Sequence, residues 1–343
     1  MNAAGIGIVF PGGAGVLALR DALQAGSPLK GVVLEREGVP VLKVPNSALA
    51  GNPVLAPARR ADRFCKMSLL AATEALAGCT AAPDRIGIIL ATAFGPHGTV
   101  FKFVNDLLEF GEAQVSPTVF SQSVHAAAAS MIASAAGLHG PALTVADLAM
   151  PFEEAMSLAE AWLESDRCDA VLVGAVDEVS DVLAHVVRRK WASPDDGVAQ
   201  PERDGITAHV PGEGAVFFRL EKRGGCRVSL GDVVSPSAIC HLFNAGALGT
   251  NDATLRQKTC PTVPAMTFTS LLGSTRIGAA FHLAVALLMR RENRVFPEIL
   301  PLASYGFRVQ AELPEKPAGT IQSISACGPR CRALTVHAPD ERG

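Results

Sequence analysis

The chain has 343 residues, of which 49% are hydrophobic and 18% are charged. This apolar content can bury a large core, and the low charged fraction excludes disorder and favours extensive burial or a large subunit interface. A net charge of −3 excludes a general attraction to nucleic acid. No apolar run is long enough to span a bilayer and no secretory signal is recognisable, so we expect a cytoplasmic protein without a membrane span.

The first third of the chain alternates short apolar strands with longer amphipathic helices. The pattern predicts, in chain order, a strand at 6–10, a helix at 16–25, a hairpin from 32–34 and 39–44, a helix after Arg60, a strand at 85–91 and a helix at 99–110. Such alternation favours an α/β fold.

The next segment predicts a small-residue helix at 126–136, introduced by Ser121, Ser123 and His125. A strand at 143–146, a helix at 152–164 and a strand at 170–175 then form one βαβ unit. In the second half, strands are predicted at 215–220, 227–234, 320–325 and 333–337, and an apolar helix at 277–291. Residues 236–264 are expected to form a compressed connection.

The turn between the predicted strand at 143–146 and the following helix is a favourable place for a nucleophile. The positive end of a helix dipole stabilises a thiolate there. The residue in this position is Ala149, whose methyl group has no nucleophilic chemistry. Asp147 could act on a proton, but a carboxylate at a helix start is more often a cap.

Eight cysteines are scattered along the chain, and only Cys327 and Cys331 are close together. No second pair completes a zinc site, so we expect free thiols, no disulfide framework, no metal and no cofactor. A redox-active or ligating role for this pair is the alternative interpretation.

Several segments, in the correct order, resemble the β-ketoacyl synthases of the thiolase-fold superfamily: 5–11, 60–76, 140–152 and 168–178. The segment 116–125 is similar to a divergent branch found beside fatty-acid and polyene pathways. The resemblance implies a thiolase-like layered α-β-α-β-α fold with two pseudo-repeated halves. It divides the chain into an N-terminal half at 1–180, with a degenerate nucleophile elbow, and a shortened C-terminal half at 181–343.

The departures from this family include all of its catalytic positions. The resemblance places its Cys at Ala149, its second His at Thr275 and its Lys near Ser270. The stretch that carries the first His is missing, and His241 is not in that context. The family's Gly-Phe-Gly-Gly loop corresponds to 327–331. Condensation needs an acylated nucleophile and a stabilised oxyanion, so no catalytic residue of that reaction is expected here.

The resemblance therefore implies a non-catalytic, chain-length-factor-like subunit in fatty-acid, polyene or polyketide biosynthesis. Its expected partner is an active β-ketoacyl synthase in a heterodimer, or a second copy in a homodimer. An acidic acyl carrier protein is a further candidate partner for two basic groups, Arg59, Arg60 and Arg63, and Arg188, Arg189 and Lys190. Cations at a helix end also compensate the helix dipole, so both interpretations stay open.

A second hypothesis is an acyltransferase or thioesterase-type enzyme. It would use Ser123 or Ser121 with His125 as base, or a shifted Cys, in place of the missing thiol. Ser123 and His125 are two residues apart, so both side chains would point to one side of an extended segment. The opposing interpretation is that His125 begins the alanine-rich helix and bonds only to backbone.

Overall fold

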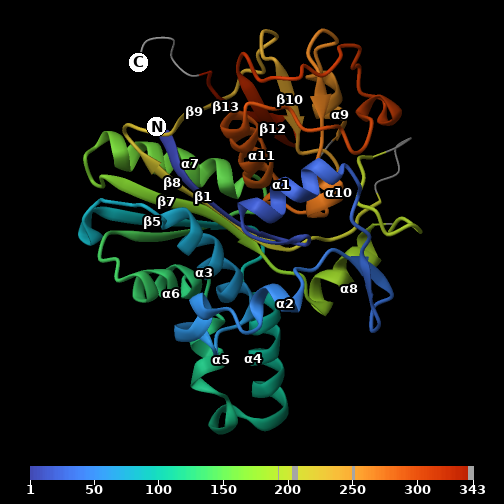
Figure 1. The fold of residues 1–343 in the computed structure, drawn as a ribbon. Coiled ribbons are helices and arrows are strands. Elements are labelled where there is room, and N and C mark those ends of the chain that lie inside the picture. Colours follow the sequence, from blue (N-terminus) through green and yellow to red (C-terminus); the bar gives the residue numbers. More distant parts are fainter. Residues whose placement is uncertain (192, 203–207, 249–251, 339–343) are drawn as a thin grey trace.

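The computed structural model describes residues 1–191, 193–202, 208–248 and 252–338. One mixed sheet of 11 strands runs through the molecule, and a separate two-stranded hairpin pairs β3 (Val32–Leu34) with β4 (Val39–Val41). The predicted α/β class is confirmed, and Figure 1 shows helices on both sides of the sheet.

Apart from the short β2 (Gly13–Ala14), which pairs with β1, the large sheet consists of two five-stranded groups with the same internal order. The first group runs β1 (Asn2–Phe10), β8 (Gly214–Glu221), β7 (Ala170–Asp177), β5 (Ile86–Thr92), β6 (Ala142–Ala146). The second runs β9 (Cys226–Gly231), β13 (Arg330–Val336), β12 (Ile321–Cys327), β10 (Cys240–Phe243), β11 (Ala265–Met266). In each group the last three strands run parallel to one another. The second strand pairs antiparallel with both the first and the third.

This repeated order confirms the two pseudo-repeated halves. The groups meet where β1 pairs with β9, through Asn2 with Arg227 and Ala3 with Cys226. β8 lies beyond residue 180 yet belongs to the first group. The predicted division of the chain into 1–180 and 181–343 is not decided by the strand order, and it stays a prediction.

The predicted helices occur with bounds shifted by a few residues, and four short helices that were not predicted, α2, α5, α9 and α10, are present as well. They are α1 (Val16–Ala25), α2 (Asn46–Leu49), α3 (Arg63–Leu76), α4 (His97–Phe110), α5 (Pro117–Gln122), α6 (Ala127–Ala136), α7 (Pro151–Glu164), α8 (Asp181–Lys190), α9 (Asp252–Gln257), α10 (Thr269–Leu272) and α11 (Gly278–Glu292). None of the helices in the described ranges is both long and apolar enough to cross a membrane.

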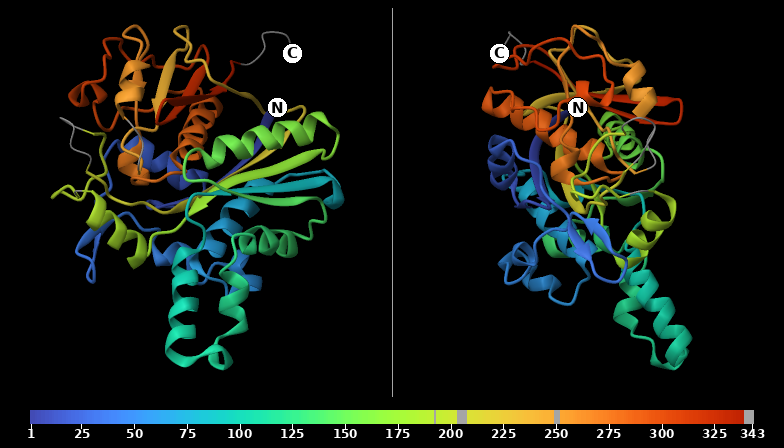
Figure 2. Two further views of the ribbon diagram at one scale, coloured as in Figure 1. Left: turned by 180° about the vertical axis from the view of Figure 1, so that it is seen from behind. Right: turned by 90° about the vertical axis from the view of Figure 1, so that its right-hand side faces the viewer.

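The inner helical layer is formed by α7 and α11. Along β7, Val171, Val173 and Ala175 face the core that contains these helices, whereas Ala170 and Leu172 face the core under α3 and α6. Twelve of the 15 residues of α11 are buried, so this helix is apolar all round, as a central layer requires. Figure 2 shows the resulting layers from two further sides.

The second half is shortened, as expected. The connection from β1 to β5 carries α1, α2, α3 and the small hairpin, whereas only residues 232–239 separate β9 from β10. The predicted compressed connection at 236–264 is nevertheless not featureless. It contains β10 and α9, while residues 249–251 lie outside the described ranges. The outer cover of the second group includes Leu255 of α9, Leu302 and Phe307.

The contact of α3 with β1 depends on glycine. A Cβ built on Gly7 would lie 1.9 Å from the carbonyl oxygen of Ala71, and one on Gly5 2.0 Å from that of Ala75. Both distances are far below van der Waals contact, so only glycine lets the helix backbone lie this close to the strand. The opening strand and the third helix are therefore fixed against each other.

The helices α4 and α5 form a hairpin that projects from the body of the protein (Figures 1 and 2). No residue of either helix is buried. Phe103 packs against Phe120 with ring centroids 5.4 Å apart. The rest of the apolar surface of α4 stays uncovered, with Leu108 79% and Phe101 47% exposed.

Candidate functional site

The carboxyl ends of the parallel strands of both halves meet at the inner layer, where α/β proteins commonly bind ligands. Asp177 ends β7 and Cys327 ends β12, and these are equivalent strands of the two groups. By strand alternation both side chains lie on the face of the inner helices. The helix α7 begins just after β6, and α11 follows β11 by way of α10.

Ala149 lies in the turn between β6 and α7, and it is half-buried. One Asp147 carboxylate oxygen, Oδ2, accepts a hydrogen bond of 2.9 Å from the Met150 N–H, so this carboxylate caps the turn. The elbow is therefore formed and held by its own polar contact. It presents the methyl group of Ala149 at the position predicted for a nucleophile.

Ser270 and Thr275 follow β11 and precede α11, on the equivalent connection of the second half. Ser270 is buried in α10, and its hydroxyl has no hydrogen-bond partner among the described residues. The Thr275 hydroxyl accepts from the Ile277 N–H at 3.4 Å. Neither hydroxyl can replace an imidazole or an ammonium group, because neither titrates near neutral pH.

Arg276, which the structure places at this centre, could not be singled out from the sequence. Its Nη1 donates to the Cys327 sulfur at 3.9 Å, and its buried Nε has no partner in the part of the chain described. The only signal in the sequence is a cation between Thr275 and an otherwise apolar helix start. Its partner Cys327 is 51 residues away, so spacing could not connect them.

Asp177 and His209 are two more buried groups at this centre. Asp177 Oδ1 accepts from the Thr92 hydroxyl at 2.7 Å and from the Ala93 N–H at 3.0 Å, while Oδ2 is left without a described partner. Burial raises the pKa of Asp177 to about 6, against the lowering effect of these hydrogen bonds and of the Arg276 charge. Burial lowers the pKa of His209 to about 4, and the Arg276 charge acts in the same direction.

Two other buried histidines have structural roles. His241 on β10 donates from Nε2 to the Ser235 carbonyl at 3.0 Å, and burial lowers its pKa. His282 on α11 donates from Nδ1 to the Gly278 carbonyl at 2.9 Å and accepts from the Phe268 N–H at Nε2. Burial lowers the pKa of His282 to about 4.

The expectation of an extended segment around Ser123 and His125 is wrong. Residues 117–122 form α5, and Ser123 ends it. The hydroxyls of Ser121 and Ser123 donate to Thr118 and Phe120 carbonyls, at 3.0 and 2.8 Å, because hydroxyls at a helix end bond readily to their own backbone. The His125 ring is exposed and lies beside Gly95, where an added Cβ would approach it to 2.6 Å. Within the described ranges, no hydrogen bond joins either serine to His125.

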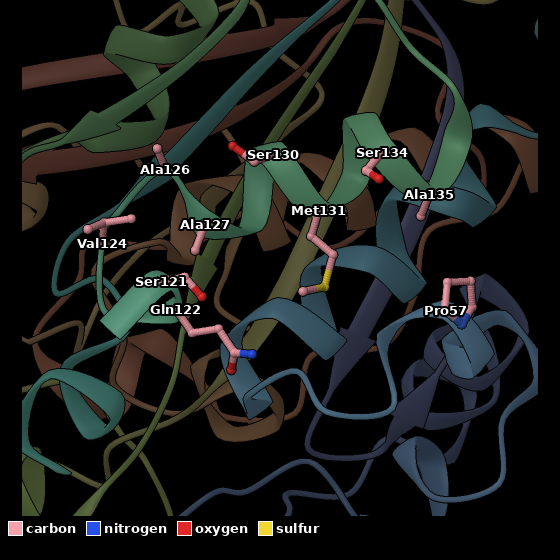
Figure 3. A pocket seen from close by; sticks show the side chains of 10 residues that line it. All are labelled: Pro57, Ser121, Gln122, Val124, Ala126, Ala127, Ser130, Met131, Ser134 and Ala135. Carbon is pink, nitrogen blue, oxygen red and sulfur yellow. The ribbon is translucent and has the colours of Figure 1, made fainter. Parts of the chain in front are cut away.

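An open pocket of about 540 Å³ lies between α5, α6 and Pro57 (Figure 3). It is lined by Pro57, Ser121, Gln122, Val124, Ala126, Ala127, Ser130, Met131, Ser134 and Ala135. None of these side chains can act as an acid or base near neutral pH. The pocket can therefore hold a group, but the lining offers no proton-transfer chemistry.

The predicted basic groups differ in their availability. The Arg63 guanidinium Nε donates to the buried Glu213 carboxylate at 2.7 Å, and Arg188 Nε lies 3.0 Å from Glu37. Both of these cations are therefore committed to the fold. Arg59 and Arg60 are exposed and have no ion pair within the described part of the chain.

Cys327 and Cys331 are not a pair. Ala326 lies opposite Cys331 in the β12–β13 ladder, so Cys331 faces the outer core while Cys327 faces the inner layer. The described residues also contain no cluster of three or more His, Cys, Asp or Glu that could hold a metal ion.

Comparison with known proteins agrees with this architecture. Solved structures that cover 98% of this chain and 98% of their own include a β-ketoacyl synthase from Burkholderia phymatum (TM-score 0.79, 16% identity) and the ishigamide ketosynthase/chain length factor (TM-score 0.77, 16% identity). A third, the ketosynthase ApeO in complex with its chain length factor ApeC from Xenorhabdus doucetiae, has a TM-score of 0.74. These likenesses confirm the thiolase-like ketosynthase fold.

Curated relatives point to the same family. The ketoacyl synthase alpha subunit of the tetracenomycin polyketide synthase of Streptomyces glaucescens is 27% identical over 65% of this chain. The chain spans only 57% and 58% of the length of two such Streptomyces relatives. Residues 53–224 match the N-terminal domain of β-ketoacyl synthases, a segment that covers half of the chain. The protein therefore belongs to the β-ketoacyl synthase family.

Proposed function

We propose that this protein is a non-condensing, chain-length-factor-like subunit that pairs with an active β-ketoacyl synthase in polyketide, polyene or fatty-acid biosynthesis. The observation that carries the proposal is the elbow itself. The β6–α7 turn is formed and capped, yet it presents Ala149. Without a nucleophile no acyl chain can be held covalently there.

The surface supports pairing. β6 is an edge strand, and its burial pattern leaves Ala142, Leu143 and Ala146 exposed. An unprotected edge strand is a ready site for strand addition by another chain. The exposed apolar face of α4 and the open pocket beside α6 are further surface that a subunit would bury.

The partner favoured here is an active ketosynthase. Complexes of a ketosynthase with a chain length factor are among the structures that share this fold. A homodimer would bring together two elbows without a thiol, so it would bind acyl groups without condensing them. We also propose that Arg59 and Arg60 are the cations available to an acidic acyl carrier protein.

The hypothesis of an acyltransferase or thioesterase is less well supported. It requires a hydrogen bond from Ser123 or Ser121 to His125, and both hydroxyls donate to backbone carbonyls instead. His125 is also absent from the lining of the pocket.

The β6 edge provides a sharp test. The Ile88 N–H donates to the Pro141 carbonyl and the Asp147 N–H to the Thr92 carbonyl, so odd-numbered residues of β6 bond to β5. The Thr144 N–H therefore points to the open edge. Thr144→Pro removes this donor without breaking the β5 ladder, and Thr144→Val is the matched control that keeps it.

The experiment is co-expression with an active β-ketoacyl synthase from the same source organism, followed by light scattering and product analysis. We expect the isolated protein to show no condensation, and the wild type and Thr144→Val to co-purify with the ketosynthase and set product length. Thr144→Pro should weaken the complex at least about tenfold, a change of about 1.4 kcal/mol. Condensation by the isolated protein, or unchanged products without it, would refute the proposal.

A further inference from the structure

The hairpin of α4 and α5 is attached to the body of the protein at its base. Neither helix has a buried residue, and the pair projects clear of the sheet (Figures 1 and 2). Among the described residues, its hydrogen bonds to the body, outside residues 95–125, come from Gly98, Thr99 and Gln122. Further out the contact is apolar, where Phe101 lines an open pocket beside α8. The orientation of the hairpin therefore depends on a few polar contacts at its base.

One residue of the body, Asp62, holds both helices of the hairpin. Its carboxylate Oδ2 accepts from the Thr99 hydroxyl on α4 at 2.7 Å, and its N–H donates to Gln122 Oε1 on α5 at 2.8 Å. The Gln122 Nε2 also donates to the Arg60 carbonyl at 3.1 Å, so one side-chain amide bridges two backbone groups before α3. Asp62 is itself fixed, because its Oδ1 accepts from the Cys65 N–H and caps α3.

The two connections between the hairpin and the body lie against each other. Gly95, before α4, has a φ of +62°, and a Cβ built on it would lie 2.6 Å from the ring of His125, which follows α5. Both the positive φ and the close approach require glycine. The Gly98 N–H, three residues further on, donates to Glu178 Oε1 at 2.8 Å. The chain therefore leaves and re-enters the body at one place, as at a hinge of a few loop residues.

We propose that the contacts of Asp62 with Thr99 and Gln122 form a latch. When this latch opens, the hairpin turns as a rigid body about the Gly95–His125 contact. The three latch residues are half-buried, where water competes for their hydrogen bonds, so the latch can open without unfolding the protein. Gln122 on α5 lines one side of the pocket of about 540 Å³ and α6 lines the other, so turning the hairpin changes the width of this pocket (Figure 3). A closed latch also holds the apolar face of α4 in one orientation, which lowers the ordering cost of binding a partner.

The test is hydrogen exchange, resolved to single amides, on the full chain without a partner. Thr99→Val removes the bond from α4 to Asp62, and a concerted latch should then release α5 as well. We expect exchange of the Asp62 N–H, which is bonded to Gln122, to rise at least about tenfold, while amides inside α4 keep their wild-type rates. Thr99→Ser keeps a hydroxyl and should retain most of the protection. Thr118→Val, the same substitution at an exposed position of α5, is the matched control.

The reciprocal variant keeps the proposal testable if Thr99→Val does not fold. Gln122→Met removes both amide bonds of α5, and it should raise exchange of the Gly98 N–H on α4 at least about tenfold, with Gln114→Met, exposed between the two helices, as its control. An effect confined to the substituted helix, equal effects of the controls, or faster exchange inside α4, which would mean local melting, would each overturn the proposal. The latch does not rest on pairing with a ketosynthase, since exchange is measured on the isolated chain.

Discussion

The two halves of the molecule share one strand order but differ in what covers the strands. In the first half α3 and α6 form a complete outer layer, and α3 lies against β1 at distances that only glycine permits. In the second half a short α9 and the loop around Phe307 take that place. The inner layer, by contrast, is well covered in both halves, with 8 of the 14 residues of α7 and 12 of the 15 residues of α11 buried. We infer from this difference that the strand order depends on the inner helices and is maintained with a reduced outer layer.

The strand ends differ in a second way. β7 ends in two buried acids, Asp177 and Glu178, whereas β12 ends in Cys327 beside Arg276. The first end is therefore sensitive to pH, while the second carries a fixed positive charge.

The largest expected effect tests the outer layers. Gly7→Ala on β1 places a Cβ 1.9 Å from the Ala71 carbonyl, so we expect it to lower the free energy of unfolding by about 3 kcal/mol. Gly231→Ala on β9, the equivalent strand, meets nothing within 4 Å and should change stability by less than about 0.5 kcal/mol. Urea unfolding of both variants measures this, and equal losses would contradict the comparison.

The next prediction concerns the strand ends. Burial raises the pKa of Glu178 from 4.5 to about 8, so between these values the folded protein binds more protons than the unfolded chain. The free energy of unfolding should therefore fall as the pH rises through this window, with a contribution from Asp177 up to pH about 6. Glu178→Gln should be more stable than the wild type at pH 8 and show a smaller pH dependence.

Unfolding by urea at pH 5, 6.5 and 8 checks this, with Glu109→Gln as the exposed control. A wild-type stability that rises over the same range, or identical slopes for the wild type and Glu178→Gln, would show that this carboxyl is ionised when folded.

The smallest effect on stability is expected for substitutions in the projecting hairpin of α4 and α5, compared with substitutions in the body of the protein. Leu108 is 79% exposed, so Leu108→Gln should change the free energy of unfolding by less than about 0.5 kcal/mol. Phe103→Gln removes the ring that packs on Phe120, and it should cost more. If α4 lies in the proposed subunit interface, Leu108→Gln should still weaken association with the ketosynthase in an equilibrium binding assay, and unchanged binding would remove α4 from that interface.

Elements with strong periodicity could be predicted from the sequence. The strand 85–91 and the helices at 16–25 and 152–164 were within two residues of their observed bounds. Burial on both faces gives the strand a continuous apolar run, and burial on one face gives each helix its period. The segment after Pro117 was not predicted as a helix, since a six-residue helix with no buried side chain leaves no periodic signal. Arg63 is a similar case, because its partner Glu213 is 150 residues away.

The candidate site likewise has one part that could be predicted from the sequence and one that could not. Ala149 could be placed from the sequence because the elbow is a local motif of strand, turn and helix. The contact of Arg276 with Cys327 could not, because it joins the turn before α11 to the end of β12, 51 residues away. A local motif can be recognised in one segment of the sequence, whereas a contact between distant segments becomes visible only in the folded sheet.

The projecting hairpin has a consequence for the protein's life in a cell. In cells, chaperones and proteases continuously triage protein that is not stably folded. If the proposed pairing with a ketosynthase buries α4 and α5, assembled copies would be protected, while unassembled copies would keep these helices exposed. The abundance of this chain would then follow assembly rather than its own synthesis.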